Sequence, residues 1–336
     1  MLYYEVKAFL KKFIFLIFQD NANSGHRRKM IGGNKKITIL LSLYGQSIFW
    51  EDFFESLKQQ SEQNFTLLYR FDGKRDGIMA ERLAKYDFSS ELTPSDAKGL
   101  PETYWELLKN APDNDYTMFA DQDDIWHADK VQCSLEAMEK AEALYGKETP
   151  ILIHSDLRVV DQELSEISPS FVKHQSLNPR KKDFKSLMLQ NNVTGCTVMI
   201  NRALRNIVRF PEYTICHDWH LALTAAAFGK IVFADTALID YRQHGGNVFG
   251  AVQRKDLLSK KNQRQYLHER LQFTQKQAAS FLELYREKLS TEQIKYLEAW
   301  SRNLHEKSYL KRLFCLFRRN FRKHDWLRTI GMWWAI

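Results

Sequence analysis

The sequence contains no apolar stretch that approaches the roughly 18 uninterrupted residues of a membrane-spanning helix. It also lacks internal repeats, low-complexity segments and any CxxC pair. The four cysteines, Cys133, Cys196, Cys216 and Cys315, are widely separated, so their spacing fits neither a zinc site nor a disulfide framework. We therefore expect a globular body with reduced and mostly buried thiols, as in a cytosolic protein.

Positive charge is concentrated at the end of the chain. The formal net charge is +8, and nine Lys/Arg but two Asp/Glu lie from Arg302 onward. The rest of the chain, with 40 basic and 39 acidic residues, is nearly neutral. No recognised nucleic-acid-binding module accompanies the charge, so we expect no nucleic-acid partner.

The same tail combines its basic residues with apolar ones. Leu310, Phe314 and Phe317 alternate with lysines and arginines, and Met332-Trp333-Trp334 lies close to the end of the chain. A basic amphipathic segment of this kind favours an anionic membrane surface as a partner. The alternative is a helix packed on the body with a solvated basic face.

Short apolar runs alternate with amphipathic segments along the body of the chain. Ile37–Leu43 is a continuous apolar run, as in buried parallel strands, and Phe49, Phe53 and Leu57 follow at helical spacing. Further strands are predicted at 65–69, 116–120, 151–154, 197–200, 231–234 and 238–241. This alternation predicts an α/β fold with a mostly parallel central sheet flanked by helices.

We expect three segments. Residues 1–34 form an N-terminal appendage, in which a short apolar run after Lys11-Lys12 fits an amphipathic helix, although Met30 offers an alternative start. Residues 35–255 form the main α/β domain. Strand signals vanish near Asp256, so residues 256–336 are predicted to be a helical C-terminal extension that ends in the basic amphipathic tail.

Three carboxylates, Asp121, Asp123 and Asp124, follow the predicted strand 116–120. They repel one another unless solvent or a cation relieves the repulsion. Oxygen ligands on a tight turn suit Mg²⁺ or Mn²⁺, which use one or two carboxylates together with substrate phosphates. Asp72 follows the neighbouring strand, and ligands of such sheets bind beyond these strand ends. A solvated acidic loop that caps the next helix is the alternative.

Six segments of the chain carry a resemblance to a known family. They are Ile39–Tyr44, Asp72–Gly77, Tyr116–Trp126, Asn192–Thr197, His217–Trp219 and Tyr241–Asn247. In this order they resemble the motifs of glycosyltransferase family 2, which has the GT-A fold, and most closely its rhamnosyltransferase-like branch. The resemblance covers roughly residues 36–250 and implies that 35–255 is a GT-A catalytic domain. The chain departs from the pattern at Lys98-Gly99-Leu100-Pro101, where relatives carry Asn-Leu-Gly.

The resemblance implies an inverting, metal-dependent transfer of a sugar from a nucleoside diphosphate. Asp121 would approach the donor ribose, Asp123 would bind Mn²⁺ or Mg²⁺, and Asp72 would lie near the nucleobase or ribose. His244 would complete the metal–diphosphate site. Arg242 would pair with the donor phosphates, with a structural salt bridge as its alternative. The expected donor is dTDP-L-rhamnose, and a UDP-hexose is the second choice.

The resemblance also assigns an acceptor side. Asp218 would be the catalytic base, and desolvation beside the ring of Trp219 would raise its pKa towards the range that a base needs. An N-capping aspartate is the structural alternative. Thr194 and Gly195 would border the acceptor cleft. Independently of the resemblance, we expect Trp219 to contact the acceptor because aromatic rings stack on sugar faces, with ordinary core packing as the alternative.

Such enzymes extend glycans or lipid-diphosphate-linked glycans in bacterial cell-surface polysaccharide synthesis. We therefore expect a cytoplasmic enzyme attached peripherally to the inner face of the membrane. A nucleotidyltransferase is a second hypothesis, although Tyr44-Gly45-Gln46-Ser47 lacks a lysine for a triphosphate. A catalytically dead membrane-bound scaffold is a third. Asp121, Asp123, Asp218 and His244 argue against it, because a dead site is free to lose such residues.

Overall fold

The computed structural model describes residues 35–45, 48–92, 98–244, 263–302 and 305–336, which belong to one compact unit, Lys35–Ile336. The predicted appendage 1–34 lies outside the described residues, as do Gly245 and Gly246 of the last family motif. No helix in the described part of the chain has the length and apolar character needed to cross a bilayer.

A nine-stranded sheet forms the centre of the unit. Its strands are β1 (Ile37–Leu43), β2 (Phe65–Phe71), β3 (Ser89–Glu91), β4 (Tyr116–Ala120), β5 (Ile125–Trp126), β6 (Ile151–Val160), β7 (Glu166–Ser168), β8 (Met199–Asn201) and β9 (Lys230–Arg242). The order is β3-β2-β1-β4-β8-β6-β9-β5, with β7 paired to β6. Six strands run in one direction, whereas β5, β7 and β8 run against it. The predicted α/β class with a mostly parallel sheet is confirmed.

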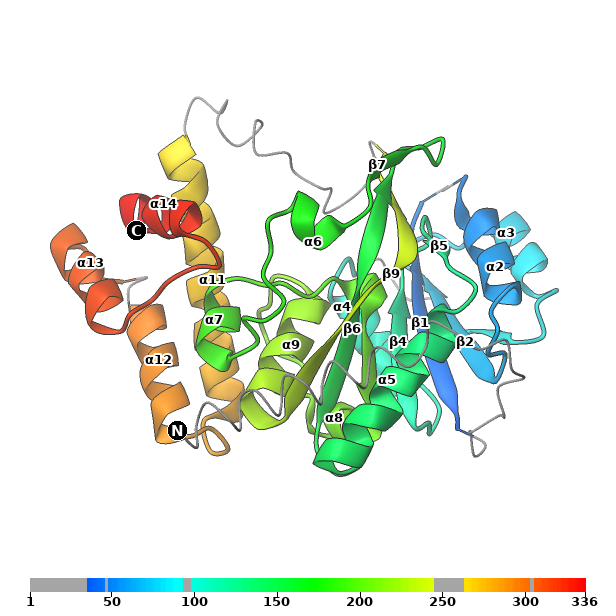
Figure 1. Ribbon diagram of the computed structural model, residues 1–336, viewed down its shortest axis with the longest axis horizontal. Coiled ribbons are helices and arrows are strands. Elements are labelled where there is room, and N and C mark those ends of the chain that lie inside the picture. The colour runs from blue at the N-terminus through cyan, green and yellow to red at the C-terminus, as the bar shows by residue number, and fades with distance from the viewer. Residues whose placement is uncertain (1–34, 46–47, 93–97, 245–262, 303–304) are drawn as a thin grey trace, which may run out of the picture. The chain divides into compact units, whose positions relative to one another are not determined.

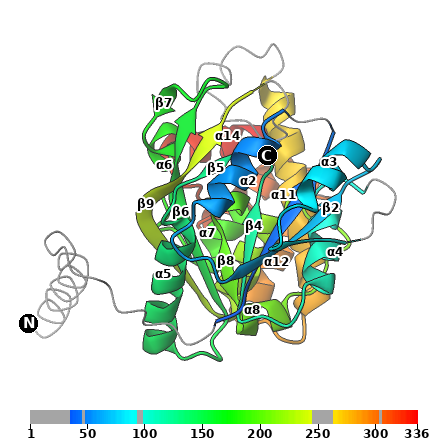
Figure 2. The same ribbon diagram turned by 90° about the vertical axis from the view of Figure 1, so that its right-hand side faces the viewer.

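Helices cover both faces of the sheet, as Figures 1 and 2 show. Those used below are α2 (Trp50–Lys58), α3 (Gly77–Leu83), α4 (Glu102–Asn110), α5 (Lys130–Tyr145), α6 (Phe171–His174), α7 (Phe184–Leu189), α8 (Arg202–Ile207), α9 (His217–Phe228), α11 (Gln263–Tyr285), α12 (Thr291–Arg302), α13 (Tyr309–Arg318) and α14 (Trp326–Ala335).

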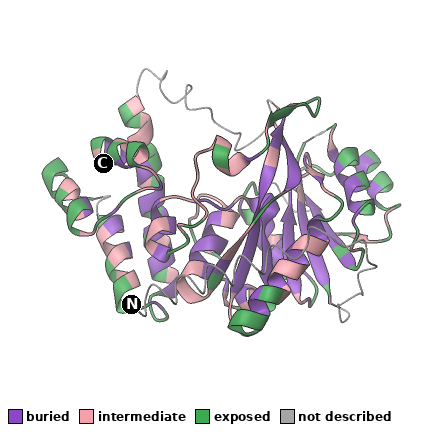
Figure 3. Ribbon diagram, in the orientation of Figure 1, coloured by how far each residue is buried: buried purple, intermediate pink, exposed green. Residues whose placement is uncertain are grey.

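Alternate residues of β1 enter two different cores. Ile39 and Leu41 pack with residues of α2, α3 and α5, whereas Leu40 packs with residues of α4, α7, α9 and α11. Because both faces are covered, the strand is apolar throughout its length and has no polar face. Figure 3 shows the resulting burial of the central strands.

The predictions for the later strands differ from the structure. Residues 231–234 and 238–241 were expected as two strands but form one, β9. Its parallel pairing with β6 continues past Asp235 and Thr236 because register shifts near Asp156 absorb the irregularity. The strand predicted at 197–200 starts later, at Met199, because Gly195–Thr197 forms a 3₁₀ turn.

The C-terminal helices do not have a hydrophobic core of their own, separate from that of the sheet. Phe281, Trp300 and Phe321 belong to the same buried cluster as Leu40 of β1 and Phe119 of β4. The sheet therefore supports α11, α12 and the loop before α14 through shared packing.

Candidate active site

The acidic segment 121–124 connects β4 to β5, and the pairing of β5 with β9 determines what lies beside it. Ile125 and Trp126 pair with Asp240 and Ile239, so the carboxyl end of β9 runs next to the acidic turn. Beyond that end, His244 Nε2 lies 2.6 Å from Asp123 Oδ2. The two residues predicted as metal ligands are therefore neighbours, although they are far apart in the sequence.

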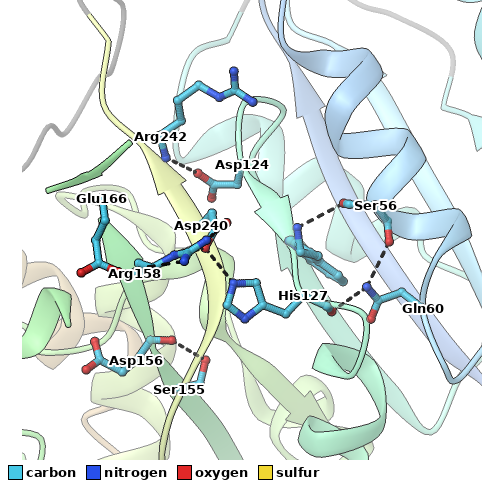
Figure 4. A network of polar contacts seen from close by, with 11 residues as sticks. Ser56, Gln60, Asp124, His127, Ser155, Asp156, Arg158, Glu166, Asp240 and Arg242 are labelled. Atoms are coloured by element: carbon cyan, nitrogen blue, oxygen red, sulfur yellow. Dashed lines mark hydrogen bonds and ion pairs between the residues drawn. The ribbon is translucent and has the colours of Figure 1, made fainter. Parts of the chain in front are cut away.

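A polar network holds this part of the sheet in place (Figure 4). Asp240 of β9 bonds His127 Nε2 at 2.7 Å and the guanidinium of Arg158 at 2.7 and 2.5 Å. Burial acts to raise the pKa of Asp240, but the hydrogen bonds from His127 and Arg158 outweigh it and lower the pKa to about 2. Asp240 is therefore a charged anchor at neutral pH.

Asp124 stabilises the acidic turn with a buried carboxylate. Its side chain is fully buried, and one carboxylate oxygen accepts the backbone N–H of Arg242 at 3.3 Å. Burial, followed by the charges of Asp123 and Asp121, raises its pKa well above the usual value. Asp124 therefore ties the acidic turn to the carboxyl end of β9.

Arg242 is engaged by the protein itself. Its guanidinium donates to Asp52 of α2 at 2.7 Å and lies 4.3 Å from the centre of the Phe49 ring. The side chain is 4% exposed. The structure thus contains the salt bridge that the sequence left open as the alternative to a donor contact.

Asp121 contacts a residue that the sequence did not single out. Tyr104 of α4 donates its hydroxyl to the Ala120 carbonyl at 2.6 Å and to Asp121 at 3.1 Å. Burial, followed by the charge of Asp123, raises the pKa of Asp121 to about 7, and Asp218 contributes in the same direction. Tyr104 also packs on the ring of His217, so this one side chain contacts both Asp121 and the residue before Asp218. Tyr104 follows the apolar spacing of an amphipathic helix, so the pattern gave no signal of this role.

Asp72 and Gln122 organise the loops at the strand ends. The Asp72 carboxylate accepts the N–H groups of Lys98 and Gly99 at 2.7 and 2.9 Å, within the segment where the chain departs from the family pattern. Gln122 exchanges two hydrogen bonds, of 3.0 and 2.8 Å, with the backbone of Tyr44 after β1. The first pair of contacts joins the turn after β2 to the segment before α4, and the second pair joins the loops that follow β1 and β4.

Asp218 lies in the first turn of α9. The helix begins at His217 and its N-cap is Cys216, so Asp218 does not occupy the capping position proposed as its alternative role. Burial raises the pKa of Asp218 to about 6, against hydrogen bonds from Cys216, Trp219, Gly195 and Asn191 that lower it. This value suits a base near neutral pH.

Gly195 packs directly on the start of α9. A Cβ atom at Gly195 would lie 2.9 Å from Nε2 of His217 and 3.6 Å from Cβ of Asp218. The His217 ring cannot retreat easily, because it is buried against Tyr104, with ring centres 4.0 Å apart. The predicted acceptor residues Thr194, Gly195 and Asp218 therefore lie side by side.

Trp219 does not fit its predicted role. Its indole N–H donates to the Leu187 carbonyl at 2.6 Å, and the residue is 8% exposed within the core that includes α7 and α9. The helix turns this side chain inward, so the structure gives Trp219 a packing role in place of the predicted acceptor contact.

Two sets of side chains could hold a cation. Asp121, Asp124 and Cys196 offer ligand atoms within 4.8 Å of one another. Burial raises the pKa of the Cys196 thiol, and a protonated thiol is a poor ligand for Mg²⁺ or Mn²⁺. Asp123 and His244 offer a carboxylate and an imidazole with partial exposure. The ligand types of this second set suit Mn²⁺, which combines a few protein ligands with oxygens of bound phosphates.

Lys130 is a buried cation that sequence reasoning missed. Its ammonium lies 4.2 Å from the centre of the Trp126 ring, and the residue is fully buried. Burial lowers its pKa to about 8, while Cys196 and Asp124 act in the opposite direction. A lysine in the first turn of a helix is normally exposed to solvent, so the sequence pattern gave no sign that Lys130 is buried.

No protein-family model matches the sequence. A curated relative, the dTDP-rhamnosyl transferase RfbG of Shigella flexneri, is 21% identical over 229 residues, which cover 63% of this chain and 74% of the relative.

Solved structures with similar folds include TarS 1–349 of S. aureus in complex with UDP-GlcNAc. Its TM-score is 0.51 at 13% identity, over 88% of this chain and 78% of that one. The mannosyltransferase PcManGT of Pyrobaculum calidifontis, in complex with GDP-Man and Mn²⁺, has a TM-score of 0.50 at 13% identity, over 85% and 73%. With RfbG, these likenesses confirm the predicted GT-A fold, the resemblance to glycosyltransferase family 2 and the class of enzyme: the chain is a glycosyltransferase-like protein of the GT-A fold.

Proposed function

We propose that this protein is an inverting glycosyltransferase that uses a divalent cation and moves a sugar from a nucleoside diphosphate to an acceptor hydroxyl. The observation that carries the proposal is the assembly of Asp123, His244 and Asp218 around the ends of β4, β9 and the start of α9. Tyr104, which donates to Asp121 and packs on His217 next to Asp218, supports a donor side and an acceptor side within one site.

The proposed donor is dTDP-L-rhamnose, and a UDP-hexose is the alternative. The relative RfbG supports the first choice by its description as a dTDP-rhamnosyl transferase. TarS, which was solved with UDP-GlcNAc, has a similar fold and is the reason to keep the second. Asp121 and Asp72 are proposed to face the donor ribose and base, although Asp72 already accepts two backbone N–H groups.

Each step of the proposed reaction has a residue suited to it. Asp123 and His244 would hold the cation, which supplies positive charge to the leaving diphosphate when it is bound. Asp218 accepts the proton of the acceptor hydroxyl as that oxygen attacks the anomeric carbon. Its pKa of about 6 leaves it ionised at pH 7 and still basic enough to take a proton. Thr194 and Gly195 border the acceptor.

The proposed acceptor is a glycan or a lipid-diphosphate-linked glycan of bacterial cell-surface polysaccharide synthesis. Exposed apolar residues of α13 and α14 beside the basic tail support peripheral attachment to an anionic cytoplasmic membrane face. Nothing in the charge pattern suggests nucleic acid as a partner.

The test is the release of nucleoside diphosphate from a panel of sugar nucleotides with Mn²⁺ or Mg²⁺. Slow hydrolysis of one donor is expected in the wild type and is expected to be lost in Asp123→Ala. Asp129→Ala is the matched control, because it removes an exposed carboxylate eight residues from Asp121 that caps no helix through its side chain. Asp218→Asn should retain donor binding, measured as a Tm increase with Mn²⁺ and nucleoside diphosphate, while turnover is lost.

Other outcomes of this assay contradict the proposal. Pyrophosphate release from a nucleoside triphosphate would identify a nucleotidyltransferase. If the wild type neither binds nor hydrolyses any sugar nucleotide with either metal, the protein is not a transferase of this type and the scaffold hypothesis takes its place.

A further inference from the structure

A group of cationic side chains lies where the loop before α14 meets the segment that leads into α7. The Lys181 ammonium donates to the Lys323 carbonyl at 3.0 Å, and the backbone N–H of His324 donates to Gln190 Oε1 at 3.1 Å. Figure 1 shows this red loop approaching the green segment around α7. The basic tail thus folds back onto the acceptor side of the protein.

Arg328 at the start of α14 fixes the loop. Its guanidinium donates to the carbonyls of Gln175 and Ser176 at 2.5 and 2.7 Å and to Asp325 at 2.6 Å. Arg328 is therefore a positioning residue for the loop that carries Lys323 and His324.

The group is poor in compensating acids. Burial lowers the pKa of Lys323 to about 8, with Arg270 and Arg328 contributing. Burial also lowers the pKa of His324 to about 4, with Lys181, Arg328 and Lys323 contributing. Asp325 is the carboxylate that acts on both, and Arg328 already engages it. Like charges gathered in this way favour an anion as their partner.

His324 adds an unused hydrogen-bonding group. The residue is 8% exposed, and neither ring nitrogen has a hydrogen-bond partner within the part of the chain that the structure describes. A buried polar group without a partner is costly, and a ligand oxygen would satisfy it.

Two consecutive residues join this group to the proposed base. Gln190 receives the hydrogen bond from His324, and the side-chain amide of Asn191 donates to Asp218 Oδ1 at 3.3 Å. Arg270 lies on α11, which contacts α14 close by: Nδ1 of His268 is 2.7 Å from the Ala335 carbonyl oxygen. The charge of Arg270 also acts on Cys216, two residues before Asp218. The cationic group therefore lies beside the place where an acceptor hydroxyl would react.

We propose that Arg270, Lys323 and His324, with Lys181 and Arg328 holding the loop, form a subsite for a phosphate or diphosphate group on the acceptor. The proposal rests on the proposed transferase function and specifies its acceptor as an anionic, phosphate-bearing glycan. A lipid diphosphate and a phosphodiester of a polymer share this chemistry. Lysine and arginine are the residues that proteins use for phosphate oxygens, and a neutral glycan would leave their charge unmatched.

The experiment is calorimetric titration of the full-length protein with geranyl diphosphate, inorganic pyrophosphate and geraniol. EDTA is present so that no cation can recruit these anions to the donor site. The wild type is expected to bind at least one of the two diphosphates and not geraniol. Arg270→Gln with Lys323→Gln should weaken binding at least tenfold. Arg322→Gln, which removes an exposed positive charge next to Lys323, should leave it unchanged.

Lys323→Arg retains the charge and is expected to bind as the wild type does, which separates loss of charge from loss of folding. Tighter binding of geranyl diphosphate than of pyrophosphate would support a lipid-borne phosphate, and equal binding would support a phosphate of a polymer. Absence of diphosphate binding in the wild type, or equal affinity in the double variant and Arg322→Gln, would overturn the proposal.

The diphosphate titration and the sugar-nucleotide assay test the two proposals separately. Sugar-nucleotide hydrolysis by the wild type without diphosphate binding in EDTA would leave the transferase proposal standing and remove the phosphate subsite. Absence of hydrolysis and of donor binding would instead remove the transferase proposal itself.

Discussion

At the scale of single residues, the environment of Asp218 predicts how activity depends on pH. Because burial raises its pKa to about 6, protonation should abolish its role as a base in mildly acidic solution. We expect kcat/KM with saturating cation to fall about tenfold per pH unit below about pH 6. Kinetic measurements from pH 5 to 8 test this. A flat profile, or full activity of Asp218→Asn, would contradict it.

The same carboxyl predicts a change in stability. Its pKa is raised in the folded state, so its contribution to stability is most favourable below the ordinary value of 3.8 and is lost as the pH rises through about 6. Asp218→Asn should therefore raise Tm at pH 8 and change it little at pH 4. Thermal melting at both pH values measures the effect, and equal shifts would show that ionisation is not the cause.

Gly195 is predicted to be intolerant of any side chain. Gly195→Ala places a methyl group 2.9 Å from the buried His217 ring and should cost on the order of 1–3 kcal/mol of folding free energy. Gly77→Ala is the control, because a Cβ there meets no atom within 4 Å. Chemical denaturation compares the two variants. A cost for Gly195→Ala no larger than that for Gly77→Ala would show that the contact relaxes freely.

At the scale of secondary-structure elements, one ion pair ties β9 to α2 and can be tested against its neighbour. Asp52→Ala leaves the guanidinium of Arg242, which is 4% exposed, without this carboxylate and should cost on the order of 1–3 kcal/mol, because Asp52 itself is 52% exposed. Glu51→Ala breaks the adjacent pair with Arg82, whose side chain is 54% exposed, and should cost about 1 kcal/mol or less. Both acids lie in the first turn of α2, so their helix-dipole contributions match.

Denaturation curves for the two variants decide this prediction. Because β9 leads to His244, Asp52→Ala should also weaken the Tm increase produced by Mn²⁺ and nucleoside diphosphate. Equal costs for the two substitutions would mean that other contacts of Arg242 compensate for its burial.

The elements that the sequence predicted best are those with continuous apolar runs. The predicted bounds match the observed bounds for two strands, Ile37–Leu43 and Tyr116–Ala120. Both faces of these strands are buried, so each is a continuous apolar run that can be recognised without knowing its neighbours. The union of two predicted segments into β9 was missed, since Asp235 and Thr236 are part of one strand only because β6 pairs with the residues on either side of them. Pairing partners of this kind do not appear in a local pattern.

The sequence predicted those residues of the candidate site that a motif places at strand ends. It did not predict the contacts that depend on how a helix packs against the sheet. The proximity of Asp123 and His244 was expected from the resemblance. By contrast, the contact of Tyr104 with Asp121 depends on the angle at which α4 meets the sheet. Trp219 was expected to contact the acceptor because aromatic rings stack on sugars, but a helix of mostly small and apolar residues does not show which face it buries.

At the scale of the whole chain, the surface of α13 and α14 predicts binding to a charged bilayer. Leu310, Phe314 and Phe317 are 74%, 65% and 56% exposed, and the same segment carries Lys311, Arg312, Arg318 and Arg319. We expect the protein to sediment with vesicles that contain phosphatidylglycerol and much less with phosphatidylcholine alone, and salt should weaken the binding. Phe314→Ser should reduce it several-fold.

Leu144→Ser is the control for this prediction, because Leu144 of α5 is equally exposed, at 72%, but lies outside the basic tail. Equal loss of vesicle binding in both variants would indicate nonspecific hydrophobic adsorption to the vesicles. Binding that ignores lipid charge would contradict an electrostatic contribution from the tail.

The shared core has a consequence for engineering. The cluster that contains Leu40 and Phe119 also contains Phe281, Trp300 and Phe321. A chimera that joins the sheet of this protein to the last helices of a homologue would therefore bring side chains of unmatched shape together in the core. A recombination junction near residue 256 would therefore exchange helices whose described side chains share one core with the sheet. New acceptor preferences are therefore better sought by changing side chains around the existing loops than by exchanging modules.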